Sequence, residues 1–183
     1  EHPLARTPAG TLGPEYYVIE EGMGGRTTVW DDPGTGTLRI QALPIALQSH
    51  KPLDLVILAL GTNDCKVHLN ATPKIIAKGM ENLCNLVQHF DYGPGYKVPQ
   101  ILVVSPVHIG EDLDHCPFVS FDETSPVKSR SLAPLYEQAA RSLGCMYIDA
   151  ASLARAVPWT SSIWMPKTMG LWRKASYCCQ IFF

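Results

Sequence analysis

The stretch LDLVILALGTND, residues 53–64, decides the fold class, because its first eight residues form a nearly continuous apolar run that ends at Gly61. Such a run is typical of a parallel strand that is buried on both faces of a sheet. We therefore expect a strand over 53–60. The polar residues that follow it should lie beyond the carboxyl end of that strand, where open parallel sheets bind their ligands.

Further strands and helices are predicted on both sides of this run. Strands are indicated at 16–21, 101–106 and 146–149. Thr72-Pro73 supplies an N-cap and a first-turn proline for one long helix, Ser125-Pro126 opens another, and residues 41–49 form a weak helix despite Pro44. Helical spacing predicts these inward residues: Leu43, Leu47, Ile76, Met80, Leu83, Val87, Phe90, Leu132, Leu135, Ala139 and Leu143. Strands that alternate with helices predict an α/β fold with a parallel sheet.

Composition and charge exclude several classes of function. The chain has 183 residues, 46% of them hydrophobic, and a formal net charge of -2, which fits one globular domain without a nucleic-acid partner. No apolar run approaches the ~18 residues of a membrane span, and residues 1–4 do not begin a signal peptide. The six cysteines and the scattered histidines match no metal-ligand spacing. We therefore expect a cytoplasmic protein with reduced thiols and with no metal, cofactor or membrane anchor.

Two loops follow predicted strands and carry residues suited to chemistry. In GTND, residues 61–64, the amide of Asn63 is a neutral donor that suits a developing oxyanion, although Asn-Asp after a strand is also ordinary turn chemistry. In GMGGRTT, residues 22–28, three glycines allow a backbone N–H to approach a ligand closely. This loop has neither G-x-G-x-x-G nor a Walker lysine, so it is not a phosphate loop.

Together these loops resemble the SGNH/GDSL hydrolases. The stretch VIEEGMGGRTT at 18–28, continued by DDP at 31–33, resembles the second block of the family in its arylesterase/acyltransferase branch. SHKPLDLVIL at 49–58, running into GTND, is similar to the third block. VVSP at 103–106 and YIDA at 147–150 resemble the later strands, so that the resemblance covers residues 16 to about 155.

The resemblance implies a flavodoxin-like, three-layer α/β/α fold and acyl transfer through a serine ester, on small acetyl or aryl esters. It assigns the backbone N–H of Gly25 and the side chain of Asn63 to an oxyanion hole. Neighbouring candidates for binding a small-molecule ester are Gly24, Arg26, Asp64 and Lys66, although solvent exposure is the default for Arg26 and Lys66. The family needs no cofactor. Substrate identity, hydrolysis against acyl transfer, and homo-oligomerisation stay open.

Two parts of the family pattern are missing from these residues. No Gly-Asp-Ser nucleophile motif occurs, and the chain opens at what resembles the second strand. The family strand order 2-1-3-4-5 would place the absent strand between 16–21 and 54–60, so we expect a gap or a non-family pairing there, with unpaired backbone groups at exposed edges. No Asp-x-x-His follows the last strand, and the sequence DLDH at 112–115 stands too early, so a solvated loop is the better interpretation.

The neighbouring reading frame restores the missing pair. Residues 150–183 contain no Asp or Glu. Read one base early, Trp159-Thr160 encodes Asp, and Ser162-Ile163 encodes His if that serine is AGC, which gives Asp-x-x-His at the family's place. We infer a frameshift near residues 157–158, and divide the chain into an irregular arm at 1–15, an incomplete hydrolase domain at 16–157 and an out-of-frame tail at 158–183. That tail, with Trp164 and Trp172, should pack poorly.

The sequence thus predicts a serine ester hydrolase by descent that is inactive as these 183 residues stand. An alternative is a non-catalytic pseudoenzyme that at most binds small ligands. A flavodoxin-like nucleotide binder is a third hypothesis, which the absence of a phosphate loop disfavours.

Overall fold

The computed structural model describes residues 16–22, 24–29, 42–111, 113, 120–153 and 179–182. The strands in these ranges are β1 (Tyr17–Glu20), β2 (Leu55–Leu58), β3 (Gln100–Ser105), β4 (Met146–Asp149) and β5 (Cys179–Phe182). The α-helices are α2 (Ala42–His50), α3 (Pro73–His89), α4 (Thr124–Ser142) and α5 (Ala150–Leu153). Two 3-10 turns, η1 (Asn63–Cys65) and η2 (Val67–Leu69), join β2 to α3.

The five strands form one parallel sheet in the order β1-β5-β2-β3-β4. Because all five run in the same direction, their carboxyl ends lie at one edge of the sheet. Loops 21–29 and 59–72 both leave that edge. The α/β fold with a parallel sheet, predicted from the alternation of strands and helices, is confirmed.

The two faces of the sheet bury alternate residues of the same strands. All four residues of β2 are buried, as an uninterrupted apolar strand requires. Val56 and Leu58 join the core beneath α3 and α4, whereas Leu55 and Ile57 join a second cluster on the opposite face. Ala150 of α5 belongs to this second cluster. Burying one such side chain stabilises the fold by about 1.5–3 kcal/mol, so both faces contribute to holding β2 in place.

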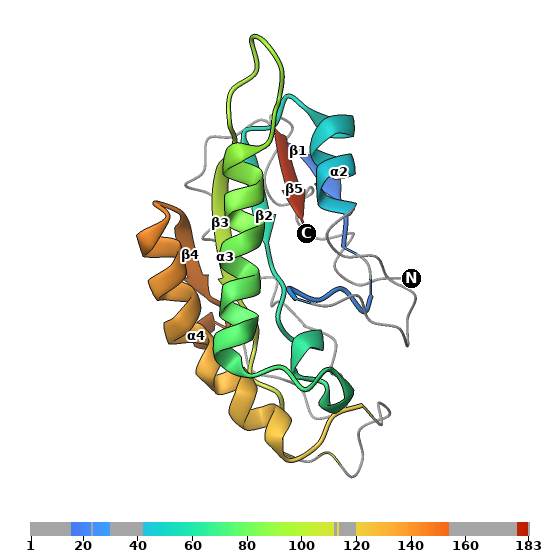
Figure 1. Ribbon diagram of the computed structural model, residues 1–183, viewed down its shortest axis with the longest axis vertical. Helices are drawn as coiled ribbons and strands as arrows, with labels where there is room; N and C mark the ends of the chain where they lie inside the picture. The colour runs from blue at the N-terminus through green and yellow to red at the C-terminus, as the bar shows by residue number, and fades with distance from the viewer. Residues whose placement is uncertain are drawn as a thin grey trace.

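The two long helices lie on one face of the sheet, and Figure 1 shows α3 and α4 packed side by side across β2, β3 and β4. The predicted inward face of α3 is confirmed, since Ile76, Met80, Leu83 and Val87 are all buried. Phe90 lies just beyond the helix and is partly buried. On α4, Leu132 and Ala139 are buried, and Leu135 is partly buried against the same core with Leu143, which follows the helix.

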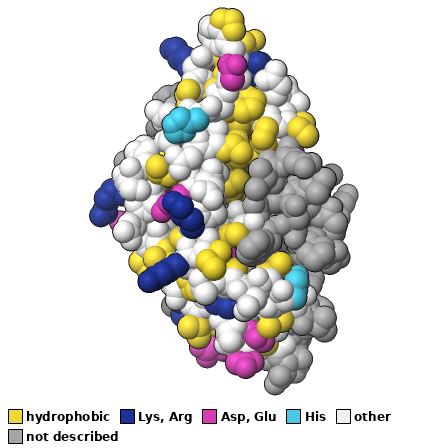
Figure 2. All heavy atoms as spheres, in the orientation of Figure 1, with side chains coloured by type: hydrophobic (Ala, Val, Ile, Leu, Met, Phe, Trp, Pro, Cys, Tyr) yellow, Lys and Arg dark blue, Asp and Glu magenta, His cyan; other side chains and the backbone are white. Residues whose placement is uncertain are grey.

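The weak helix predicted at 41–49 is present as α2. Its Leu43 and Leu47 are fully buried, and Pro44 is accommodated in the first turn, where backbone N–H groups have no partner inside the helix. In the orientation of Figure 1, hydrophobic side chains gather between α2 and the upper part of α3 in Figure 2. These two helices therefore share an apolar contact on this side of the sheet.

The strand between β1 and β2 corrects our expectation. We expected a gap or a non-family pairing there, with exposed edges, and β5 fills the place by parallel pairing with both neighbours. A non-family pairing is therefore present at this place, and the expected gap with its unpaired edges is wrong. Residues 179–182 of the tail that we expected to pack poorly form a regular strand. A short run containing Ile181 and Phe182 has the β propensity to complete a sheet that leaves two facing edges open. Residues 154–178, with Trp164 and Trp172, lie outside the described residues, as does the arm at 1–15.

Candidate active site

The loop after β2 turns sharply beneath α4. Gly61 has a φ of 125°, and a Cβ on it would lie 2.6 Å from the hydroxyl oxygen of Tyr136. That hydroxyl is fully buried with its ring and donates to the carbonyl of Leu60 at 3.2 Å. Only glycine combines this φ with so close a neighbour. The chain can therefore enter η1 directly, with Asn63 as its first residue.

The Asn63 side chain contacts the glycine-rich loop. Its Nδ2 donates to the carbonyl oxygen of Arg26 at 2.9 Å. An amide nitrogen has two hydrogens, so this bond orients the side chain and leaves a second N–H for another acceptor. Gly25, one residue before Arg26, has a φ of 90°, a conformation that glycine adopts without strain. The two predicted oxyanion residues therefore belong to segments joined by a direct hydrogen bond.

Asp64 fastens the glycine-rich loop from beneath. Its carboxylate has no exposed surface and accepts from the backbone N–H of Thr28 at 2.7 and 2.9 Å and from that of Val29 at 3.2 Å. Burial raises the pKa of Asp64, and the hydrogen bonds from Thr28 oppose that rise. We expected Asp64 to contact substrate. The structure instead uses its oxygens to hold the loop, because a buried carboxylate must satisfy its acceptors within the protein.

Gly79 of α3 provides the surface on which Thr28 rests. A Cβ at this position would lie 2.6 Å from the Thr28 carbonyl oxygen and 2.7 Å from its Oγ1. The hydroxyl of Thr28 shares its hydrogen between Asp64 Oδ1, at 2.8 Å, and the carbonyl of Ile76, at 3.0 Å. Sequence reasoning missed this residue. Its signal was an isolated glycine inside an otherwise amphipathic helix, which usually has a packing reason.

The cationic candidates are more buried than we expected. Arg26 is 6% exposed and its guanidinium lies 3.8 Å from Glu21, whose other oxygen is 2.9 Å from Nε2 of His50. Burial lowers the pKa of Arg26, and the negative charge of Glu21 raises it. Lys66 is 9% exposed. We expected both side chains to be exposed to solvent, and both lie within the protein at the base of the loops. Of the six predicted site residues, only Gly24 is exposed.

Three solved structures of similar sequence are esterases. The native aryl esterase of M. smegmatis is 36% identical over 82% of this chain and 71% of that chain, with a TM-score of 0.74. Its inhibitor-bound form is 34% identical over 90% and 78% of the two chains, with a TM-score of 0.78. A carbohydrate acetylesterase from Sinorhizobium meliloti is 37% identical over 79% and 68%, with a TM-score of 0.70. The chain belongs to the SGNH/GDSL hydrolases, in their arylesterase-like branch.

The similarity covers most, but not all, of the length of each solved chain. This chain spans 66% to 78% of the length of the solved chains that it matches. No family model and no curated protein matches it. The agreement in structure supports the three-layer α/β/α arrangement expected of an SGNH/GDSL hydrolase.

Cys65 and Ser105, a buried thiol and a buried hydroxyl, are engaged in structural contacts in this SGNH/GDSL chain. Cys65 is buried, its thiol donates to the carbonyl of Gly61 at 3.4 Å, and burial raises its pKa to about 12, so it stays protonated. Ser105 is also buried, and its hydroxyl donates to Asp149 at 3.0 Å and accepts from Tyr147 at 3.1 Å. Neither group has the environment of an activated nucleophile.

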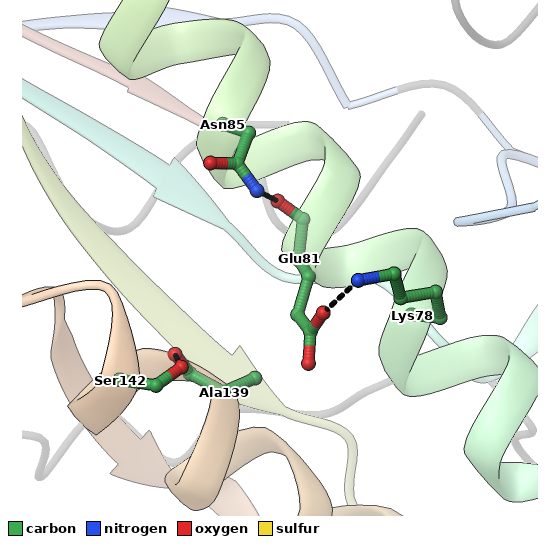
Figure 3. A network of polar contacts seen from close by, with 5 residues as sticks. All are labelled: Lys78, Glu81, Asn85, Ala139 and Ser142. Atoms are coloured by element: carbon green, nitrogen blue, oxygen red, sulfur yellow. Dashed lines mark hydrogen bonds and ion pairs between the residues drawn. The ribbon is translucent and has the colours of Figure 1, made fainter.

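A separate cavity lies between α3 and α4. It has a volume of about 250 Å³ and is lined by Lys74, Ala77, Lys78, Glu81, Leu135 and Gln138, none of which is a predicted site residue. Figure 3 shows two of these lining residues on α3, Lys78 and Glu81, which pair at 2.6 Å, and Asn85, which donates to the Glu81 carbonyl. Such pairs between neighbouring turns are ordinary helix-surface contacts.

The remaining findings concern groups expected to be absent. Within the described ranges, no group of three or more His, Cys, Asp and Glu side chains is placed to hold a metal ion. None of the helices there is long and apolar enough to cross a membrane. Residues Asp112, Asp114 and His115 of the early Asp-x-x-His pattern lie outside the described residues.

Proposed function

We propose that this chain descends from a serine ester hydrolase of small acetyl or aryl esters, and that its Gly25 N–H and Asn63 side chain are two donors of the oxyanion hole. The observation that carries the proposal is the hydrogen bond from Asn63 to the Arg26 carbonyl, which fixes the amide beside the Gly25 loop. A neutral, oriented donor at the carboxyl edge of a parallel sheet suits a tetrahedral oxyanion. The esterase relatives support the class of reaction.

We further propose that the 183 residues, as they stand, do not turn over esters. They contain no Gly-Asp-Ser motif and no acidic residue after Asp149, so neither the family nucleophile nor its Asp/His pair is supplied. In serine hydrolases, loss of the nucleophile or its base costs ~10⁶-fold in rate. An oxyanion hole with binding alone accounts for ~10³–10⁴ over water when it is intact. Here the hole also lacks the N–H of the nucleophile itself, and one such donor is worth ~10²–10³.

The test combines turnover with covalent labelling. Hydrolysis of p-nitrophenyl acetate by the purified 183-residue chain should equal that of the Asn63→Ala variant and of the buffer alone. A fluorophosphonate probe should leave the intact mass of the chain unchanged. Hydrolysis above the buffer rate, together with stoichiometric labelling of one serine, would show that another residue has taken the nucleophilic role and would overturn the proposed inactivity.

The alternative proposal is a pseudoenzyme that binds small esters without cleaving them. The buried clamp around Asp64 favours it as a second candidate, because this clamp holds the glycine-rich loop without any contribution from a nucleophile. Isothermal titration calorimetry with a non-hydrolysable phosphonate ester separates the two candidates. Saturable binding that Asn63→Ala weakens supports a binding remnant, whereas absence of binding leaves only descent from an esterase.

A further inference from the structure

Two cysteines from distant parts of the sequence meet at the end of the α3–α4 interface. Cys84 lies on α3 and is fully buried, whereas Cys145 lies between α4 and β4 and is partly buried. Cys145 packs against the core cluster that contains Cys84, and Gln88, one turn after Cys84 on α3, lies with its Nε2 3.8 Å from the Cys145 sulfur. The two thiols are close enough to shift each other's pKa.

The backbone around Cys145 is held in place from both sides. Gln88 of α3 donates from Nε2 to the carbonyl of Leu143 at 2.8 Å, and the same nitrogen lies 3.8 Å from the sulfur of Cys145. The N–H of Cys145 donates to the carbonyl of Ala140 at 2.8 Å. Gly144, with a φ of 67°, makes the turn between them. The position of Cys145 beside α3 is therefore fixed by the fold.

The two thiols differ in reactivity. The neighbouring Cys84 thiol lowers the pKa of Cys145, and the neighbouring Cys145 thiol together with burial raises the pKa of Cys84. Cys145 is thus the thiol that ionises first and that solvent reaches, which is the pattern of an attacking cysteine beside a resolving one. Cys65 differs on both counts, because it is fully buried and burial raises its pKa to about 12.

We propose that Cys84 and Cys145 form a reversible dithiol–disulfide site that reacts with low-molecular-weight disulfides. The thiolate of Cys145 attacks one sulfur of the small disulfide, which releases one small thiol and leaves a mixed disulfide on Cys145. Cys84 then attacks the Cys145 sulfur, and its proton passes to the small thiolate that this attack expels as the second small thiol. Two protein thiols are oxidised and one small disulfide is reduced to two thiols. The product ties α3 to the start of β4.

The experiment uses the full 183-residue chain and oxidised glutathione as the probe. After incubation, free thiols are blocked and the chain is digested with trypsin without reductant. We expect one linked species that joins peptide 79–97, with Cys84, to peptide 142–155, with Cys145, and a mass two hydrogens lower than the sum of the two. The other four cysteines lie in neither of these two tryptic peptides, so the mass identifies the link without ambiguity.

Matched variants identify the two roles. Cys84→Ser should keep a stable glutathione adduct on Cys145, whereas Cys145→Ser should leave Cys84 unmodified. Cys65→Ser is the control and should form the link as the parent does. A stable adduct on Cys145 of the parent chain with Cys84 still free, a link between other cysteines, or no reaction at Cys145 would each overturn the proposal. These three outcomes are all read from the digest of the parent chain, so the proposal can be overturned even if a variant fails to fold.

Discussion

A carboxylate with no exposed surface must find its hydrogen bonds inside the protein, and Asp64 finds them in one loop, at Thr28 and Val29. Burial raises the pKa of both Cys65 and Tyr136, and the negative charge of Asp64 beside them adds to that rise. At the scale of single residues, the glycine-rich loop therefore depends on a group that also titrates. That dependence can be measured through pH.

Asp64→Asn should change how stability depends on pH. The pKa of Asp64 is raised in the folded protein, so folding favours its protonated form. Its titration therefore stabilises the fold fully below its ordinary pKa, and this contribution is lost as the pH rises through the raised value. Asn does not titrate, and it places an amide against the N–H of Thr28, which costs about 1–3 kcal/mol. Urea unfolding from acidic to neutral pH should show the stability advantage of the parent over Asp64→Asn shrinking as the pH rises. An advantage that grows with pH would contradict the raised pKa.

Gly79→Ala should destabilise the protein, although alanine is the better helix former by about 1 kcal/mol. The added Cβ would lie 2.6 Å from the backbone oxygen of Thr28, and this backbone cannot withdraw while Asp64 holds it. Such overpacking costs about 1–3 kcal/mol. Gly110→Ala is the control, because nothing lies within 4 Å of its added Cβ. The free energy of unfolding of both variants decides the matter, and a Gly79→Ala variant as stable as the parent would show that the loop is not seated on α3.

At the scale of elements, α3 shows why some features follow from sequence. Its boundaries depend on local signals, namely the Thr72 cap, Pro73 in the first turn and an apolar face that repeats along the helix. The use of its glycine does not. Gly79 packs against Thr28, and Thr28 is fixed by an acceptor 36 residues further along the chain. The periodicity within a helix does not identify a partner so distant in sequence. The helix could therefore be predicted from the sequence, but the packing of Gly79 against Thr28 could not.

Thr72→Ala should weaken α3 at its first turn. The Thr72 hydroxyl accepts from the N–H of Ile75 at 3.3 Å, and the loss of such a cap costs about 1 kcal/mol. Thr72→Asp should retain most of this stability, because a carboxylate also caps a helix and favours its N-terminal dipole. Ser131→Ala is the control, because this partly buried hydroxyl donates within α4 to the carbonyl of Val127, and we expect a change within about 0.5 kcal/mol of the parent. Chemical denaturation measures the free energy of unfolding of all three variants. If Thr72→Ala is as stable as the parent, the Thr72 cap does not stabilise α3.

At the scale of the whole molecule, the sheet shows the limit of the family pattern. The place between β1 and β2 could be predicted as special, because the pattern assigns an absent strand to it. Its occupant could not be predicted, because Cys179–Phe182 carries no periodicity that names β1 and β2 as its neighbours. The site residues show the same division. Asn63 and Gly25 are proposed as site residues from their motifs, whereas the buried positions of Asp64 and Arg26 arise from contacts between loops.

The last prediction concerns the repair of activity, which should need two changes at once. One adds an upstream strand that ends in Gly-Asp-Ser, and the other shifts the reading frame near Pro158, which supplies Asp-x-x-His and replaces residues 179–182. The added strand alone must compete with β5 for one place in the sheet, and the frame shift alone removes β5 and leaves that place open. We therefore expect hydrolysis of p-nitrophenyl acetate and labelling by a fluorophosphonate only in the doubly repaired chain. In that chain, Asn63→Ala should lower kcat by ~10²–10³, the value of one oxyanion donor, with little effect on KM. Turnover in either singly repaired chain, or full activity of the repaired Asn63→Ala variant, would refute the assignment of the missing parts or of the oxyanion hole respectively.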